Sequence, residues 1–362
     1  MTEAEIAVVG GGNAAAAALR ALRDRGRSVV VIANEPAAGF HIGESLSRSA
    51  EEELRRLDVL EAYLQEPHLE TQSRFSIWGN TELVEDSAWP KASHHGWCLD
   101  RARFNAFLWA QAKATPHQRI TSHVERAEDE GEAWLISLRG GDVVRANIIL
   151  DCSGRAAVIA RRQGERSQID RLVAAYAVLP QIDGSIEPTI GSMVESIPLG
   201  WCYSVVTPDR SMVVALFTDS DLLPDKITTS IDHWREAIGA GEMTGKRIDT
   251  AGYVLEGTPA VVDASTRVGS VLATRRWLAA GDAAVCFDPL SSHGITTALW
   301  SGRAAAEAAE GILAGDVEQP DTYDTSFRSG INKYLLDRQN MYALERRFEA
   351  SPFWQRRHEQ VK

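Results

Sequence analysis

Residues 5–18 read Glu-Ile-Ala-Val-Val-Gly-Gly-Gly-Asn-Ala-Ala-Ala-Ala-Ala, an apolar run that meets three glycines and then a run of alanines. The apolar run is typical of a parallel strand that is buried on both faces. Gly10 permits a tight turn, Gly12 lets the backbone approach a pyrophosphate, and Ala15 is small enough for close packing of helix on strand. The pattern predicts a dinucleotide-binding turn.

The helix after this turn is expected to bind phosphate. Alanine is the strongest helix former, and a helix N-terminus carries about half a positive charge together with free N–H groups. We therefore expect Asn13 and Ala14 to contact the dinucleotide. A glycine turn also occurs in other α/β proteins, but Ser28-Val29-Val30-Val31-Ile32 returns as a second strand and completes a βαβ unit.

The position that usually binds the ribose does not carry an acid. In dinucleotide folds an acidic residue at the end of the second strand binds the ribose hydroxyls. That place falls at Ala33, which has no acidic group, while Glu35 stands two residues later. Glu35 either reaches the ribose or is a solvated turn residue, and the sequence leaves both interpretations open.

The composition excludes several classes of function. The chain has 362 residues with 38 basic and 50 acidic side chains, and its formal charge of −12 disfavours non-specific nucleic-acid binding and a basic membrane-docking surface. The 4 cysteines lie far apart, the 9 histidines lack metal-ligand spacing, and no apolar run is long enough to span a membrane. We expect a cytoplasmic protein with reduced thiols, no signal peptide and no metal site.

Further segments carry a resemblance to a known family. They are Gly43-Glu44-Ser45-Leu46, Arg101-Ala102-Arg103-Phe104-Asn105-Ala106-Phe107-Leu108, Asp151-Cys152-Ser153-Gly154-Arg155, Gly281-Asp282-Ala283-Ala284 and Asp288-Pro289-Leu290-Ser291-Ser292-His293-Gly294-Ile295. With the glycine turn, they resemble the FAD-dependent monooxygenase and halogenase superfamily, whose FAD domain is like that of p-hydroxybenzoate hydroxylase. The resemblance extends from Ile6 to about Arg357.

The resemblance implies an FAD site that gathers residues from these segments. It would include Gly10, Gly12, Asn13, Ala14, Glu35, Gly43, Glu44, Ser45, Arg101, Asp151, Gly281, Asp282, Pro289, Ser292, Gly294 and Ile295. Arg101 would contact the FAD phosphates, Asp282 would bind the ribityl chain, and backbone N–H groups at Gly294 would favour negative charge on the reduced flavin. Two segments have a local alternative, Ser45 as a helix N-cap and Asp100 as the cap of a helix that begins at Arg101.

The expected fold class is α/β, with a Rossmann-like FAD-binding domain interleaved with an antiparallel-sheet substrate domain and followed by a C-terminal helical tail. We expect residues 1–66, 95–166 and 268–320 in the FAD domain, 67–94 and 167–267 in the substrate domain, and 321–362 in the tail. Alternating residues predict strands within 171–179, 201–217 and 248–255. Helical spacing predicts a helix at 49–64, and residues 82–90 read as a polar loop. The tail is expected to close the core, and binding a protein partner is its alternative role.

The sequence departs from the halogenase pattern of this superfamily. Halogenases carry a Trp-x-Trp-x-Ile-Pro segment and an early lysine that directs hypohalous acid. The corresponding segment here begins at Trp201, but Tyr203 replaces the second Trp and the Ile-Pro pair is not kept. The first lysine is Lys91, so the early lysine role is unfilled and chlorination is disfavoured.

The resemblance instead implies an aromatic monooxygenase, which hydroxylates an electron-rich ring through a C4a-hydroperoxyflavin. Such an enzyme needs a dry cavity and a base. His293 is the only imidazole in the 288–295 loop and is the candidate base, because a histidine titrates near neutral pH. Its alternative role is structural, as a ring that holds Ser291 and Ser292 by hydrogen bonds. His94 and His95 are weaker candidates for the border of the substrate site.

The loop and the tail segment 351–357 look closest to the flavoproteins that mature cysteine tryptophylquinone. That likeness implies an aromatic substrate, such as a tryptophan within a partner protein or peptide. Electrons would come from NAD(P)H or from a flavin reductase, since no NAD(P)H-binding domain is visible in the sequence. The alternatives are an enzyme like the tryptophan halogenases, a dehydrogenase or reductase of the geranylgeranyl reductase type, and a flavoprotein that acts chiefly as a binding partner during maturation.

Overall fold

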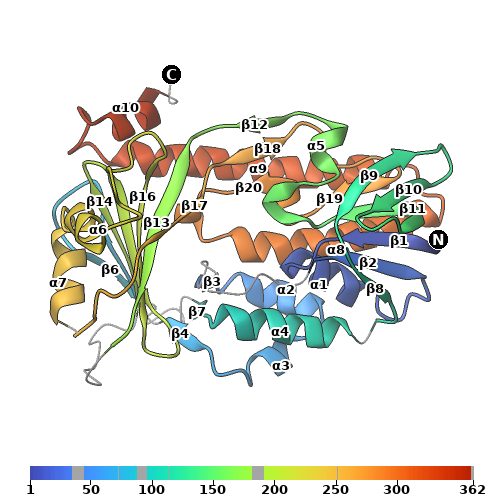
Figure 1. Ribbon diagram of the computed structural model, residues 1–362, viewed down its shortest axis with the longest axis horizontal. Coiled ribbons are helices and arrows are strands. Elements are labelled where there is room, and N and C mark those ends of the chain that lie inside the picture. Colours follow the sequence, from blue (N-terminus) through green and yellow to red (C-terminus); the bar gives the residue numbers. More distant parts are fainter. Residues whose placement is uncertain are drawn as a thin grey trace.

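Two large sheets lie at opposite ends of the molecule, and long helices run between them (Figure 1). The computed structural model describes residues 1–34, 45–71, 73–87, 96–113, 115–181, 191–250 and 252–359. Several residues singled out in the sequence lie outside these ranges, namely Glu35, Gly43, Glu44, Lys91, His94 and His95.

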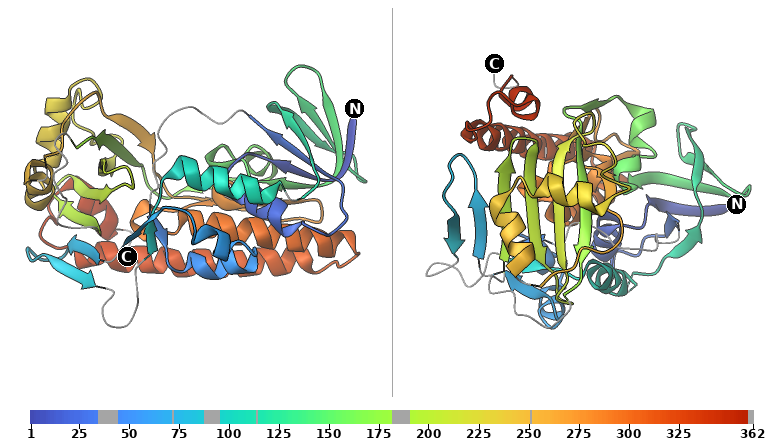
Figure 2. Two further views of the ribbon diagram at one scale, coloured as in Figure 1. Left: turned by 90° about the horizontal axis from the view of Figure 1, so that it is seen from below. Right: turned by 60° about the vertical axis from the view of Figure 1, so that its left-hand side comes forward.

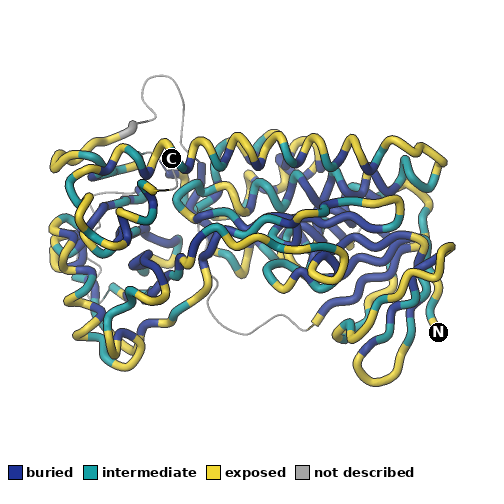
Figure 3. Tube along the Cα trace, turned by 90° about the horizontal axis from the view of Figure 1, so that it is seen from above, coloured by how far each residue is buried: buried dark blue, intermediate teal, exposed yellow. Residues whose placement is uncertain are grey.

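The first sheet is built around the glycine turn. Its central strand β1 (Thr2–Val9) pairs in parallel with β2 (Val29–Ala33) on one side and with β11 (Val143–Asp151) on the other. The strand order is β8-β2-β1-β11-β10-β9, and β19 also pairs with β11. The outer members are β8 (Gln118–Thr121), β9 (Val124–Asp129), β10 (Trp134–Leu138) and β19 (Trp277–Ala279). β2 is buried along its whole length, whereas β9 is largely exposed at the edge of the sheet (Figure 3).

The second sheet is mostly antiparallel and has the order β17-β13-β16-β15-β14-β5-β6. Its strands are β5 (Ser73–Ile77), β6 (Val84–Ser87), β13 (Leu172–Leu179), β14 (Gly191–Ile197), β15 (Gly200–Val206), β16 (Met212–Asp219) and β17 (Ala260–Asp263). Helices α6 (Ile231–Ile238) and α7 (Glu242–Thr250) cover its outer face (Figure 2). Trp234, Ile238 and Ile248 of these helices are buried against the apolar side chains of the sheet. The expected α/β class with a separate antiparallel sheet is confirmed.

Short strands join the two ends of the molecule. One small sheet pairs β7 (Gly96–Cys98) with β3 (Ser45–Ser47) and β4 (Leu69–Thr71). Another pairs β18 (Arg267–Gly269) with β12 (Arg166–Gln168) and β20 (Val285–Cys286).

Helices α8 (Gly294–Leu313) and α9 (Gln319–Leu344) run along the length of the molecule (Figure 2). Helix α8 packs closely on α1 (Asn13–Ala21), because both helices present mainly alanine and glycine to each other. The remaining helices are α2 (Ala50–Arg56), α3 (Leu60–Tyr63), α4 (Arg101–Ala112), α5 (Ala160–Gln163) and α10 (Pro352–Glu359).

Three local expectations were wrong. The helix expected at 49–64 is two helices, α2 and α3, because Asp58 between them adopts the left-handed conformation with φ 54°. The strand expected at 248–255 is absent from the described residues of that range; α7 extends to Thr250, and only Tyr253 forms an isolated bridge, with Gln181. Part of the expected loop at 82–90 forms β6.

Among the described residues, no helix combines the length and the apolar composition that crossing a membrane would require. The same residues contain no cluster of histidine, cysteine and acidic side chains that would suit a metal ion.

Candidate flavin-binding site

The glycine turn opens one end of α1 toward a cavity. Gly10 has φ 124°, and a β-carbon there would lie 2.1 Å from the carbonyl oxygen of Cys152, the residue that follows the neighbouring strand β11, so only glycine fits. Gly12 is the N-cap of α1, and no heavy atom lies within 4 Å of the place where its β-carbon would be. The first turn of α1 carries no acidic residue, which leaves its N–H groups available to an anion.

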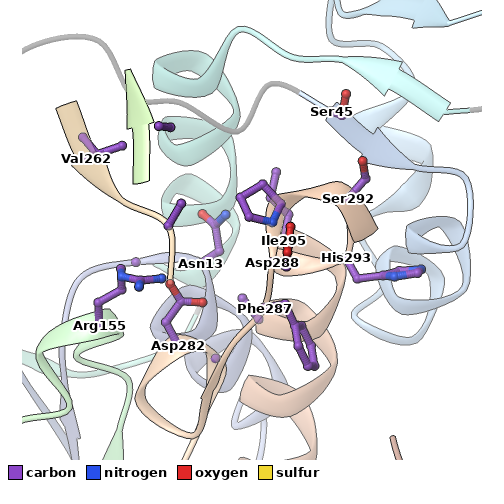
Figure 4. Close-up of a pocket in the computed structure, with 18 of the residues that line it drawn as sticks. Asn13, Ser45, Arg155, Val262, Asp282, Phe287, Asp288, Ser292, His293 and Ile295 are labelled. Carbon is purple, nitrogen blue, oxygen red and sulfur yellow. The ribbon is translucent and has the colours of Figure 1, made fainter. Parts of the chain in front are cut away.

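The cavity has a volume of about 450 Å³ and gathers most of the expected site residues (Figure 4). Of those residues, the ones that line it are Gly12, Asn13, Ala14, Ser45, Arg101, Gly281, Asp282, Pro289, Ser292, His293, Gly294 and Ile295. Gly10 and Asp151 are not part of the lining. We call this space the flavin cavity.

Asp282, Asn13 and Arg155 come together at one end of the flavin cavity (Figure 4). Asp282 follows β19 and lies in a short 3-10 turn, in which Gly281 takes φ 60°. Burial raises the pKa of Asp282, while the positive charges of Arg155, Arg166 and Arg101 act against that rise. A carboxylate that faces a cavity is suited to accept hydrogen bonds from ligand hydroxyls.

Asp151 has a structural role. Its buried carboxylate accepts hydrogen bonds from the backbone N–H groups of Ser153, Ile159 (2.9 Å) and Ala160 (2.8 Å). These bonds hold the turn that brings Gly154 and Arg155 into the cavity lining. Cys152, Gly154 and Arg155 of the same motif line the cavity, whereas Asp151 itself does not.

Two polar side chains that the sequence analysis did not assign to the site also line the cavity. Asn105 Oδ1 and Arg155 Nε are buried atoms without a hydrogen-bond partner among the described residues. Asn105 lies one turn after Arg101 on α4, a helix whose N-cap Asp100 accepts a hydrogen bond from Arg103 N at 2.9 Å. Asp100 therefore caps α4, and Arg101, the first residue of the same helix, also lines the cavity. Asn105 belongs to the 101–108 motif, and α4 brings it to the cavity together with Arg101.

The antiparallel sheet forms the opposite wall of the flavin cavity. Trp201 and Tyr203 of β15 line it together with Phe217 of β16, and the Trp201 ring stacks on Phe217 with a centroid distance of 3.9 Å. Tyr203 forms a 2.8 Å hydrogen bond with the Ser45 hydroxyl. Ser45 lies in strand β3 and is not the helix N-cap considered above; α2 begins after Ser49.

The 288–295 loop closes the cavity at the N-terminus of α8. Asp288 caps its 3-10 turn by accepting a hydrogen bond from Leu290 N at 3.0 Å, and Ser292 takes the left-handed conformation with φ 52°. Gly294 and Ile295, the first residues of α8, line the cavity, and the first turn of this helix contains no acidic residue. The loop therefore presents a helix N-terminus, which favours negative charge on a bound group.

A second cavity lies on the other side of this loop, between α8 and α9, and we call it the helix cavity. Its volume is about 560 Å³. Its lining is rich in aromatic and aliphatic side chains, namely Phe287, Leu290, Trp300, Phe327, Ile331, Tyr334 and Met341. Phe287, Asp288 and His293 line both cavities, so the loop is a shared wall.

His293 points away from the Asp282 end of the flavin cavity (Figure 4). His293 is an exposed residue, but the partial loss of water around its imidazole lowers its pKa below the usual 6.5. The positive charges of Arg74 and Lys333 lower the pKa further, and the charge of Asp337 opposes them. Its backbone N–H donates to Ser291 Oγ at 3.3 Å, and among the described residues this backbone bond is its link to Ser291. This direction favours the neutral form of the imidazole near pH 7.

The features of the flavin cavity fit FAD. Two helix N-termini without acidic residues, from α1 and α8, suit the pyrophosphate and the reduced ring. Asn105 Oδ1 and Arg155 Nε are orphaned polar atoms, and the Asp282 carboxylate faces the cavity. The aromatic wall from β15 and β16 suits a flat ring.

Comparison with known proteins supports the same cofactor. The family described as tryptophan halogenase matches residues 81–361. LodB of Marinomonas mediterranea, named as an FAD-dependent oxidoreductase, is 25% identical over 97% of this chain and 96% of its own length. FAD, the cofactor expected from the sequence, is confirmed.

Two solved structures share the fold. The myxobacterial chondrochloren halogenase CndH has a TM-score of 0.86 at 18% identity, covering 100% of this chain and 88% of its own. QhpG, a peptidyl tryptophan dihydroxylase essential for tryptophylquinone cofactor biogenesis, has a TM-score of 0.76 at 21% identity, covering 98% of this chain and 79% of its own.

Proposed function

The chain belongs to the tryptophan halogenase family, and within that family we propose that it acts as an FAD-dependent monooxygenase. Its substrate is the electron-rich ring of a tryptophan that a partner protein or peptide presents. The observation that carries this proposal is the shared wall, where an aromatic-lined cavity meets the flavin cavity at His293.

The helix cavity suits an aromatic ring. Trp300 and Phe327 meet edge to face at a centroid distance of 5.0 Å, and Phe287 and Tyr334 lie 4.2 Å apart. Aromatic side chains at such spacings stabilise a further ring through stacking and edge contacts. The rim is open to solvent, because Lys333 is 76% exposed and Met341 is 42% exposed. A side chain carried on a larger molecule can enter from that rim.

The described residues that line the two cavities do not provide a lysine suited to the role it has in halogenases. Among the described residues that line the flavin cavity, none is a lysine. Lys333 lines the helix cavity, but it is exposed and pairs with Asp337 at 2.6 Å. A lysine that carries a reactive halogen needs burial and a lowered pKa, and an exposed ion pair provides neither.

The proposed chemistry assigns a task to the neutral imidazole of His293. Reduced FAD supplies the two electrons that allow molecular oxygen to be split between the ring and water. The substrate ring loses a proton from the carbon that gains oxygen, and His293 stands at the shared wall to accept it. The electrons that reduce the FAD enter from NAD(P)H or through a flavin reductase. One atom of molecular oxygen ends in the product and the other in water.

The likeness to QhpG supports a substrate held within a partner, and the family match keeps halogenation as the second candidate. The test supplies the FAD-loaded protein with NAD(P)H and a flavin reductase, and offers free tryptophan or a tryptophan-containing peptide, each with and without chloride and bromide. We expect the peptide to gain oxygen, independently of halide, as read by mass spectrometry. Gain of a halogen atom would establish the halogenase, and oxygen gain by free tryptophan alone would contradict the partner-borne substrate.

A further inference from the structure

The 288–295 loop depends on Asp288 for its shape. Asp288 accepts hydrogen bonds from Leu290 N through its carboxylate, and from Ser291 N (3.1 Å) and Ser291 Oγ (2.9 Å) through its carbonyl. The residue is fully buried. Movement of Asp288 therefore moves the turn that carries Ser292 and Gly294 into the flavin cavity.

Helix α9 holds Asp288 through three side chains. Tyr342 OH donates to Asp288 Oδ2 at 2.8 Å, and Arg338 Nε donates to the same oxygen at 3.2 Å. Asp288 N donates to the hydroxyl of Tyr334 at 2.6 Å. Tyr334, Arg338 and Tyr342 recur at every fourth position, so they lie on one face of α9. All three side chains are buried.

The same face of α9 also holds the opposite wall of the flavin cavity. Arg338 donates to Asp170 Oδ2 at 2.9 Å, and Asp170 Oδ1 accepts hydrogen bonds from Leu172 N (3.0 Å) and Thr266 N (3.2 Å). Trp201 Nε1 donates to the Tyr342 hydroxyl at 3.1 Å. Leu172 begins strand β13 and Trp201 lies in β15, so α9 fixes the loop and the sheet relative to each other.

The two buried carboxylates, Asp170 and Asp288, depend on the positive charge of Arg338. Arg338 is the cation between the buried carboxylates of Asp170 and Asp288. Burial and the charge of Asp170 raise the pKa of Asp288, whereas Arg338 lowers it. Without the guanidinium, the two carboxylates would repel each other in a region of low dielectric.

We propose that Arg338 and Tyr342 are positioning residues that, through Asp288, set the place of the 288–295 loop against bound FAD and thereby its reduction potential. N–H groups at the N-terminus of α8 stabilise negative charge on the reduced ring, and a displaced loop weakens that stabilisation. This inference rests on FAD binding and not on the reaction proposed above, so it holds for a hydroxylase or a halogenase.

The test measures the reduction potential of the FAD-loaded Arg338→Lys and Tyr342→Phe variants by equilibration with a reference dye. Lysine keeps the charge of Arg338 but loses the planar guanidinium that contacts both Asp170 and Asp288. Phenylalanine keeps the ring of Tyr342 and loses its hydroxyl. We expect each variant to lower the ratio of reduced to oxidised flavin about tenfold at a fixed potential, which is about 30 mV for a two-electron couple.

Matched controls separate positioning from stability. Arg303 is also buried and pairs with the buried Glu53 at 2.9 Å, and Tyr323 is a buried tyrosine of α9 whose hydroxyl donates to Ala279 O at 2.7 Å. Arg303→Lys and Tyr323→Phe should lower the melting temperature comparably and leave the potential unchanged. An unchanged potential in the Arg338 and Tyr342 variants would overturn the proposal, and so would an equal shift in the controls. Loss of FAD from Tyr342→Phe at an unchanged melting temperature would overturn it as well, since the network would then act in binding.

Discussion

The backbone of Gly302 in α8 lies directly against the backbone of Ala14 in α1: a β-carbon at residue 302 would stand 2.2 Å from the carbonyl oxygen of Ala14. Ala14 belongs to the first turn of the helix whose N-terminus faces the flavin cavity. Gly281 reaches the same crossing, where its β-carbon would lie 3.3 Å from Cβ of Ala14. The contact between α1 and α8 therefore fixes the phosphate end of the site relative to the flavin loop.

Gly302→Ala is expected to destabilise the protein and to weaken FAD binding. Overpacking costs about 1–3 kcal/mol, and the 2.2 Å approach to a backbone atom places this site at the upper end. The gain in helix propensity is only about 1 kcal/mol. The matched control is Gly245→Ala in α7, where no heavy atom lies within 4 Å of the added carbon and the propensity gain should raise stability. Equal melting temperatures for the two variants would contradict the close crossing.

Asp282→Ala is expected to lose FAD, because the carboxylate that faces the cavity would be missing. Asp282→Asn keeps the shape and one acceptor oxygen, so it should retain part of the cofactor. The flavin absorbance that remains after gel filtration measures both variants. A full flavin spectrum in Asp282→Ala would place the ribityl chain elsewhere.

His293→Gln is expected to keep FAD and to slow turnover by about 10²-fold, within the usual range for a general base. The neutral imidazole is the active form, so activity in the wild type should fall as the pH drops through the His293 pKa, which lies below 6.5. The variant should lack this acidic limb in a pH profile of kcat/KM. His233→Gln on the exposed face of α6 is the control. A limb that persists in His293→Gln would leave the histidine a structural role.

Gly330→Leu is expected to obstruct the helix cavity. Gly330 lines that cavity, and no heavy atom lies within 4 Å of the place where its β-carbon would be. Each methylene that competes with a substrate for space changes kcat/KM by roughly tenfold or more. We expect a loss of at least about tenfold with an unchanged flavin spectrum, and a smaller loss in Gly330→Ala. Unchanged kinetics in the leucine variant would show that the aromatic substrate binds elsewhere.

Most of the residues that the sequence predicts for the cofactor site line one cavity, and the signals that select them are local. Gly10 has a backbone conformation that only glycine permits, and the buried run before it identifies a central parallel strand. The resemblance located Asp282 and the 288–295 loop, and the structure places both in one cavity with Asn13. Spacing along the chain was sufficient wherever a motif occupies one strand and the turn that follows it.

Other assignments needed the tertiary structure. Asp151 stands at the expected strand end, yet its carboxylate is used by the backbone of residues up to Ala160, and Arg155 lines the cavity instead. Residues 248–250 continue helix α7, because Ile248 packs on the outer face of the antiparallel sheet. An alternation of apolar and polar residues cannot distinguish a strand from a helix when the surface that buries the apolar side chains comes from a distant segment.

The sequence by itself determined the nucleotide-binding turn, the cofactor and the fold class, since glycine conformations, strand patterns and helix starts depend on neighbouring residues. The tertiary structure alone decided that the helix cavity adjoins the flavin cavity and that α9 holds Asp288. The hydroxyl of Tyr342 and the carboxylate of Asp288 are 54 residues apart in sequence and 2.8 Å apart in space. Such a contact arises from the packing of α9 on the sheet and the loop, and no spacing within one segment encodes it.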